Sequence, residues 1–292
     1  MNSINDETYP LRRLDPEEYP RLVVEAGSPP KELYIRGRFP PREYKFLTVV
    51  GSRKLSPYGE LACKRLIAGL RGYPVVIVSG LAYGVDSVAH AAALDAGLMT
   101  VAIPGSGLLE NVIYPREHLP LACKILESGG CLLSPFAGAI SSKHWTFAAR
   151  NRLMAAVSHA TLVIEAGRPS GTLITSKWAT DLDRDVMAVP GRIFDAHSEG
   201  PHHLIRMGAV PVVCAADILE VLGYSPSDDR PATEYSRLGE DERAVIRALE
   251  SPMPRQRLLE TLGMETAAAS ALISGLELKG VIEERMGELR RV

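Results

Sequence analysis

The sequence predicts an α/β protein with an extended Rossmann-like fold, in which helices cover both faces of a doubly wound, mainly parallel sheet. Short β-branched runs alternate with helical stretches, which indicates parallel βαβ units. Most of these runs are apolar without polar alternation, as expected of strands covered on both faces. The expected strands are FLTVVG (46–51), VVIVSG (75–80), MTVAIPG (99–105), CLLS (131–134), TLVIEAG (161–167), DVMAVPG (185–191) and VPVVC (210–214). The expected helices include residues 58–71, 83–97, 147–159 and 171–183.

Glycines at the ends of these strands predict where a ligand binds. In open α/β sheets, ligands bind at the carboxyl ends of the strands, where glycine lets the backbone approach closely. The glycines concerned are Gly51, Gly80, Gly105, Gly167 and Gly191. We therefore expect the site at one edge of the sheet.

The composition changes along the chain and suggests four segments. Residues 1–42 form an expected N-terminal arm that carries one short strand, and residues 43–224 form the Rossmann-like domain. Residues 225–238 are polar and contain proline, which is typical of a linker. Residues 239–292 form an expected winged-helix domain of three helices and a hairpin.

The winged-helix domain is expected to contact protein rather than DNA. Its helices are expected at residues 240–250, 254–262 and 266–279, and its strands at 281–285 and 288–292. A helix that reads the major groove needs side chains such as Arg, Lys, Asn or Gln aimed at bases and phosphates. The expected recognition helix, residues 266–280, has one lysine and one glutamate. Protein contact or dimer packing is the favoured interpretation.

Composition and charge exclude several classes of function. The chain has 292 residues, 46% of them hydrophobic, and a formal net charge of −2. Nucleic acid bound over the whole surface would call for a more basic chain, so DNA binding would need a local basic pocket. An apolar run long enough to span a bilayer and a signal peptide are both missing from the sequence, which predicts a cytoplasmic, soluble protein without membrane contact.

The cysteines and nucleotide motifs point to no metal site or cofactor. The cysteines, at 63, 123, 131 and 214, show no C-x-x-C pairing and are expected to be buried, reduced thiols. No Walker A motif occurs, and no G-x-G-x-x-G opens the first helix. Asp86 and His90 lie four residues apart on an expected helix, but a third ligand is lacking, so polar support for loops is the favoured role.

The segment VVGSRKLSPYG (49–59) is a strand, a turn and a helix start. Gly51 and Ser52 lie in the turn, and amides at the following helix N-terminus are expected to point toward an anion. Arg53 adds a planar cation suited to phosphate. The alternative is a tight turn with a surface arginine.

The segment around HWTFAARNRLMAAVS (144–158) is the most specific for function. Phe147 and Arg150 are three residues apart and share a helix face, with Asn151 and Arg152 beside them. A base stacked on an aromatic ring while arginines hold the phosphates is the arrangement of single-strand binders. From its position beside this segment, Lys143 is expected to add a contact. The alternative, which the sequence leaves open, places Phe147 in the core and the arginines in surface ion pairs.

Two further segments follow strand ends. Ser170, Gly171 and Thr172 are expected to cap a helix and to present backbone amides to an anion. Tyr114, in the loop PGSGLLENVIYPREH (104–118), lines a groove in one interpretation and belongs to a structural turn in the other.

Taken in order, these motifs resemble the DprA/Smf family of DNA-processing proteins over residues 19–223. The resemblance rests on YP (19–20), PPKELYIRG (29–37), VVGSR (49–53), SGLAYGVDSVAH (79–90), YP (114–115), F-x-x-RNR (147–152), SGTLIT (170–175) and VPG (189–191). It implies a homodimer that binds single-stranded DNA in a basic pocket, protects incoming DNA and loads RecA recombinase during natural transformation. The implied DNA-binding residues are Gly51, Ser52, Arg53, Lys143, Phe147, Arg150, Asn151, Arg152, Ser170, Gly171 and Thr172.

The chain departs from the family pattern at two positions. Pro135 stands where the family usually has glutamate, and His202 stands at a usual asparagine position. Both are expected to alter the rim of the pocket and to leave its arginines in place.

Two other functions are compatible with glycine-rich βα turns. One is a nucleotide sensor that signals through the winged helix. The other is a nucleotide hydrolase related to the LOG-like phosphoribohydrolases, which carry a glutamate in a PGG-x-GT-x-x-E motif for acid/base work. Here Thr175 stands at that glutamate position, and Glu165 has no paired acid. We therefore do not expect an enzyme.

Overall fold

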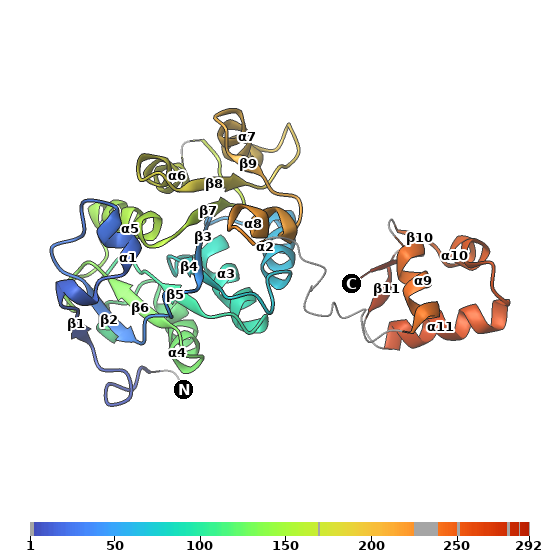
Figure 1. Cartoon of the computed structure of the whole chain (residues 1–292), viewed down its shortest axis with the longest axis horizontal. Helices are drawn as coiled ribbons and strands as arrows, with labels where there is room; N and C mark the ends of the chain where they lie inside the picture. Colours follow the sequence, from blue (N-terminus) through green and yellow to red (C-terminus); the bar gives the residue numbers. More distant parts are fainter. Residues whose placement is uncertain are drawn as a thin grey trace. The chain divides into compact units, whose positions relative to one another are not determined.

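The computed structural model describes residues 3–168, 170–224, 239–249, 252–278, 281–285 and 287–291. The chain divides into two compact units, Met1–Pro226 and Ser227–Val292, which are drawn in Figure 1 and described one at a time. The linker expected at residues 225–238 lies outside the described residues.

The first unit is built on one sheet of nine strands among the described residues, in the order β1-β2-β6-β5-β4-β3-β7-β8-β9. The strands from β6 to β9 are parallel to their neighbours, and β1 and β2 are antiparallel additions at one edge. The expected mainly parallel sheet is confirmed. The strands are β1 (Arg12–Arg13), β2 (Tyr34–Gly37), β3 (Lys45–Val50), β4 (Val75–Ser79), β5 (Thr100–Ala102), β6 (Cys131–Ser134), β7 (Ala160–Val163), β8 (Asp185–Ala188) and β9 (Val210–Pro211).

Helices cover both faces of this sheet, because side chains of alternate strand residues point to opposite faces. Leu47 and Val49 of β3 pack in one core cluster with residues of α2, α3 and α8. Phe46 and Val50 of the same strand pack in another with residues of α1 and α5. The helices of this unit are α1 (Arg21–Glu25), α2 (Pro57–Ala68), α3 (Val85–Asp95), α4 (Leu119–Glu127), α5 (His144–Val157), α6 (Thr172–Asp181), α7 (Glu199–Arg206) and α8 (Ala215–Val221). Figure 1 shows this layered arrangement.

The N-terminal segment belongs to the sheet. Leu33 and Ile35 are buried, and β2 pairs with β6. Arg36 is 1% exposed and donates hydrogen bonds to the carbonyl oxygens of Leu108 (2.8 Å) and Tyr9 (2.7 Å). A buried guanidinium with carbonyl partners ties this segment to the loop after β5.

Within its described residues, the second unit contains three helices and a three-stranded sheet, in the order β10-β12-β11. Val245, Leu258, Ile273 and Leu289 are among its buried residues. These elements lie where three helices and a hairpin were expected, and the winged-helix assignment stays a prediction. They are α9 (Glu240–Ala248), β10 (Met253–Pro254), α10 (Arg255–Leu262), α11 (Thr266–Leu278), β11 (Ile282–Arg285) and β12 (Glu288–Arg291).

The cysteines are as expected with one exception. Cys63, Cys123 and Cys131 are buried, but Cys214 is exposed. Cys214 is the residue directly before α8. Its side chain lies at the surface, before the part of the helix that packs against the core. Among the described residues, no helix is long and apolar enough to cross a membrane.

Candidate nucleic-acid interface

A cleft of about 1150 Å³ opens at the carboxyl ends of β3 and β7. The chain runs from β3 to β4, β5 and β6 on one side, whereas β7, β8 and β9 lie on the other. Such a switch point is where doubly wound sheets bind ligands. The cleft is lined by ten of the eleven residues that were expected to bind DNA: Gly51, Ser52, Arg53, Lys143, Phe147, Arg150, Asn151, Ser170, Gly171 and Thr172. Arg152 is not among them.

The turn after β3 carries exposed cations. The Ser52 hydroxyl accepts a hydrogen bond from the Lys54 amide (3.0 Å), which fixes the turn. The side chains of Arg53 and Lys54 are exposed and line the cleft. This part of the expected phosphate-binding turn is therefore presented to solvent.

The start of α2 does not offer an open anion site, which corrects the expectation drawn from this turn. The Glu165 carboxylate accepts hydrogen bonds from the amide (3.0 Å) and the hydroxyl of Ser56. The Ser56 hydroxyl in turn accepts from the Gly59 amide (3.1 Å). Glu165 is 2% exposed, and the favourable interaction between a helix N-terminus and an anion is satisfied inside the protein. The cation of Arg53, rather than the helix amides, is left for a ligand.

Phe147 lies between two arginines. The Arg53 guanidinium carbon lies 4.9 Å from the centre of the Phe147 ring, and that of Arg150 lies 5.8 Å from it. A Cβ atom on Gly105 would come within 2.6 Å of the ring, so this strand-end glycine makes room for Phe147. Cation–π contact positions Arg53 over the half-buried ring. A base that enters here therefore meets the Arg53 guanidinium plane, on which bases also stack.

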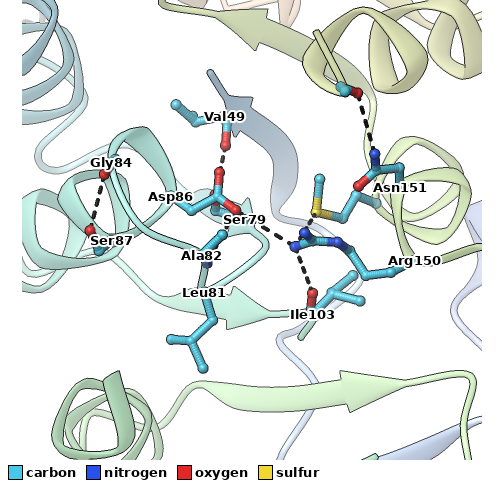
Figure 2. A network of polar contacts seen from close by, with 12 residues as sticks. Val49, Ser79, Leu81, Ala82, Gly84, Asp86, Ser87, Ile103, Arg150 and Asn151 are labelled. Atoms are coloured by element: carbon cyan, nitrogen blue, oxygen red, sulfur yellow. Dashed lines mark hydrogen bonds and ion pairs between the residues drawn. The ribbon is translucent and has the colours of Figure 1, made fainter. Parts of the chain in front are cut away.

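Arg150 and Asp86 form a buried ion pair at the floor of the cleft, 3.6 Å apart (Figure 2). Arg150 is 4% exposed and donates to the Ile103 carbonyl oxygen (3.0 Å). The Asp86 carboxylate accepts from the Ala82 amide (3.3 Å). Burial raises the pKa of Asp86, whereas the charge of Arg150 acts to lower it. Arg150 is thus an internal partner of Asp86 more than a surface contact.

The interpretation of Asp86 and His90 as polar support is confirmed. Asp86 holds the loop before α3, and the His90 Nδ1 atom lies 2.7 Å from the Thr100 hydroxyl in the core. Burial lowers the pKa of His90 to about 3, so the ring is neutral at ordinary pH. Among the described residues, no three side chains of the metal-binding types gather into a site.

The turn before α6 forms the opposite wall. The Ser170 hydroxyl accepts a hydrogen bond from the Thr172 amide (3.1 Å), as expected of a helix cap. The Asn151 side chain donates to the Gly171 carbonyl oxygen (3.4 Å). Asn151 therefore links α5 to this turn.

Arg152 points away from the cleft, which corrects its expected position. Its guanidinium carbon lies 5.0 Å from the centre of the Trp178 ring, and it lines a separate pocket. Residues two positions apart on an α-helix lie about 200° apart around its axis, so Arg150 and Arg152 face opposite sides of α5. The two arginines of the R-N-R motif thus line different cavities.

Among the other residues that line the cleft, four cationic, aromatic or imidazole side chains were not counted as expected contacts: Lys54, Tyr114, His144 and His197. The Tyr114 ring meets Phe147 edge-on, with 6.5 Å between ring centres, so the groove-lining alternative for Tyr114 is the observed one. Lys54 and His144 directly follow the expected contacts Arg53 and Lys143 in the sequence, and this proximity could have indicated them. His197 comes from the loop after β8 and had no such signal.

The cleft carries uncompensated positive charge. Asp86 is the one acidic side chain among its described lining residues, and it is paired with Arg150. The described part of the chain contains no ion pair to Arg53, Lys54 or Lys143, all three of which are exposed. A polyanion would therefore find free cations here.

The positions that depart from the family pattern lie outside the centre of the cleft. Pro135 lines the same separate pocket as Arg152. The His202 Nε2 atom lies 3.1 Å from the Gly191 carbonyl oxygen. At the positions compared with nucleotide hydrolases, Thr175 is buried and Glu165 is held by Ser56.

Comparison with known proteins identifies the family. The sequence model of the family "DNA recombination-mediator protein A" matches residues 11–223 of this chain. Protein Smf of Escherichia coli (strain K12) is 36% identical over 274 residues, which are 94% of this chain and 68% of that protein. DNA processing protein DprA of Streptococcus pneumoniae (strain ATCC BAA-255 / R6) is 38% identical over 201 residues, covering 69% of this chain and 70% of that protein.

Two solved structures share the fold. The X-ray structure of DprA from Streptococcus pneumoniae matches with a TM-score of 0.65 and 35% identity, over 74% of this chain and 78% of that one. DNA processing protein A from Helicobacter pylori matches with a TM-score of 0.64 and 25% identity, over 74% of this chain and 98% of that one. The Helicobacter pylori structure is described as showing a single-stranded-DNA binding mode. On this evidence, the chain belongs to the DprA/Smf family of DNA-processing proteins.

Proposed function

We propose that this protein binds single-stranded DNA in the cleft at the switch point, protects the strand, and loads a RecA-type recombinase onto it during natural transformation or recombination. It binds DNA rather than transforming it, and it acts in the cytoplasm. Family membership and the DNA-binding mode described for the Helicobacter pylori relative support this proposal.

The observation that carries the proposal is the group of free cations beside two aromatic rings that meet edge-on. Arg53, Lys54 and Lys143 are exposed, and Arg53 lies on the Phe147 ring with Tyr114 at its edge. Single-strand binders combine cations along the backbone with planar groups for the bases. The buried Asp86–Arg150 pair supports this surface from below.

A nucleotide hydrolase or nucleotide sensor is less favoured. Thr175 supplies no carboxylate for acid/base work, and the Glu165 carboxylate is occupied by the amide and hydroxyl of Ser56. The cleft volume of about 1150 Å³ also exceeds the roughly 300–1,000 Å³ typical of small-molecule sites.

The homodimer is proposed to form through apolar side chains around the edge strand β9. Met207 and Val213 flank this strand and are 74% and 78% exposed. Exposed apolar groups and an open sheet edge are features of association surfaces. We expect Val213→Asp to convert a dimer to a monomer in light scattering, with Arg65→Asp on the exposed face of α2 as the control. A dimer that persists in Val213→Asp would exclude this surface.

The binding proposal is tested by fluorescence anisotropy with a labelled single-stranded oligonucleotide and an unlabelled duplex competitor. The wild type should prefer the single strand, and Arg53→Ala should weaken binding about tenfold or more, as expected from loss of a charged contact and a stacking plane. Arg65→Ala, which removes an exposed arginine from α2 outside the cleft, should bind as the wild type does. Equal binding by all three proteins would refute the assignment of the cleft.

The recombinase proposal needs a separate assay. RecA filament formation on a strand covered by a single-strand-binding protein should accelerate with the wild type and less with Arg53→Ala. Tight DNA binding without acceleration would leave a DNA-protecting protein and exclude the loading function.

A further inference from the structure

A second pocket, of about 400 Å³, lies against α5 outside the cleft. Its walls are mostly apolar, with Ala149, Leu153 and Ala156 from α5 and Trp178 from α6. Pro30 and Pro135 close it from other parts of the first unit. Arg152 is the one charged side chain among the described residues that line it.

The two cavities lie on opposite sides of the same helix. Phe147, Arg150, Asn151 and Met154 line the cleft at spacings of three and four residues, which form one helical stripe. Ala149, Arg152, Leu153 and Ala156 line the pocket with the same spacings. The second stripe is displaced by two residues, or about 200° around the axis.

Small side chains separate the cavities at the surface. Ala148 lines both of them, and Ala148 and Ala149 are exposed. A ligand that passes over α5 at these two positions meets only the methyl groups of the two alanines. Ala148 therefore borders both the pocket and the cleft.

The chemistry of the pocket matches one nucleotide. The Arg152 guanidinium lies on the Trp178 ring, 5.0 Å from its centre, so a planar cation and a planar aromatic surface stand together. No ion pair to Arg152 occurs among the described residues, so its charge is free for an anion. Apolar walls that accept a flat ring, with a cation at hand for a phosphate, are what a nucleobase and its backbone require.

We infer that this pocket is a second nucleotide subsite, which accepts a base from the strand held in the cleft after that strand crosses α5 at Ala148 and Ala149. The inference rests on the proposed function of the cleft. It gives Arg152 a stretch of backbone to contact, although Arg152 faces away from the cleft and from Arg150 in the same R-N-R motif. The strand has to pass about halfway around a helix roughly 10 Å across, a path of about 16 Å.

The first test uses oligonucleotide length and a variant that fills the pocket. Labelled oligothymidylates of about 4 and about 12 nucleotides, within the range of site sizes of single-strand-binding folds, are compared by anisotropy. The wild type should bind the longer probe more tightly by about 5-fold to 100-fold, the range expected of one stacked base. Ala149→Trp should remove this gain and leave the short probe unaffected, whereas Ala149→Ser, which keeps the pocket open, should retain it.

The second test measures the fluorescence of Trp178, which lines the pocket. The chain has two tryptophans, Trp145 and Trp178, so Trp145→Phe leaves Trp178 as the sole tryptophan reporter. The longer probe should quench Trp178 fluorescence, and the short probe should not. Arg152→Ala should reduce both the quenching and the affinity gain for the longer probe.

The outcomes separate this inference from the proposed function. Tight binding of the short probe, without a length gain or without Trp178 quenching, would overturn the subsite and leave the cleft assignment intact. Equal weakening of both probes by Ala149→Trp would also overturn it, because the pocket would then not be separate from the cleft. A wild type that binds neither probe would refute the proposed function and the subsite together.

Discussion

At the scale of single residues, the Asp86–Arg150 pair supports the cleft from within. Removing one partner of a buried ion pair leaves an uncompensated charge in the interior. We expect Asp86→Asn to lower the free energy of unfolding by about 3–5 kcal/mol, measured by urea denaturation. In the double variant with Arg150→Met, the loss should be smaller than the sum of the two single losses, because the residues interact directly. Additive losses would show that the pair is not coupled.

His90 makes stability depend on pH. Its pKa of about 3 in the folded protein lies below the ordinary value of 6.5, because burial disfavours the charged ring. The unfolded chain therefore binds a proton below pH 6.5 that the folded protein does not, and stability falls as the pH drops from 6.5 toward 3. We expect a slope of up to about 1.4 kcal/mol per pH unit from this residue.

The measurement is urea denaturation of the wild type and His90→Gln at several pH values between 7.5 and 5. The difference between the two proteins isolates His90, because all other titrating groups are shared, including Asp86 with its raised pKa. The stability difference should shrink or reverse as the pH falls. A constant difference across this range would contradict a neutral, buried histidine.

At the scale of elements, the start of α5 positions the cations and rings of the cleft. The Thr146 hydroxyl accepts a hydrogen bond from the Lys143 amide (2.9 Å) and donates one to the Gly105 carbonyl oxygen. Thr146→Val keeps the shape and removes both bonds. We expect it to lower the free energy of unfolding by about 1–2 kcal/mol, as loss of a helix cap and of a buried hydrogen bond does.

The same variant should weaken single-stranded-DNA binding, since Lys143 and Phe147 flank Thr146. Thr180→Val on α6 is the control, because its hydroxyl donates to a carbonyl within its own helix, away from the cleft. Binding by Thr146→Val equal to that of the control would show that α5 does not position the site.

The sequence predicted the longer elements well. Apolar runs located the parallel strands, and four helices, α2, α3, α5 and α6, lie where they were expected. The helices α1, α4, α7 and α8 were not anticipated, and they are short, with five to nine residues each. A weak periodic signal over two turns does not distinguish such a helix from a loop.

Site contacts were predictable where they depend on neighbours in the sequence. The Ser170 cap and the shared face of Phe147 and Arg150 follow from local spacing. The opposite direction of Arg152 follows from the same helical arithmetic. By contrast, the Glu165–Ser56 contact and the Asp86–Arg150 pair join residues 109 and 64 positions apart, and only the folded sheet brings them together.

At the scale of the whole molecule, a chain with a negative net charge can present a basic cleft because its charges are segregated. The formal net charge is −2, yet the cleft contains Arg53, Lys54 and Lys143 without acidic partners among the described residues. The chain order of the strands determines this, since the switch between β3 and β7 brings their loops to one edge. Local charge, rather than total charge, is the quantity that governs binding to a polyanion.

The most direct test of this account is the salt dependence of single-stranded-DNA affinity. Each phosphate contact contributes about −0.7 to the slope of log K against log salt concentration, so contacts from Arg53, Lys54 and Lys143 predict a wild-type slope of about −2 or steeper. The double variant Arg53→Ala/Lys143→Ala should flatten the slope by about 1.4 relative to the wild type and to Arg65→Ala. A slope that is the same in all three proteins would contradict the account, because the cations of the cleft would then not contact the strand.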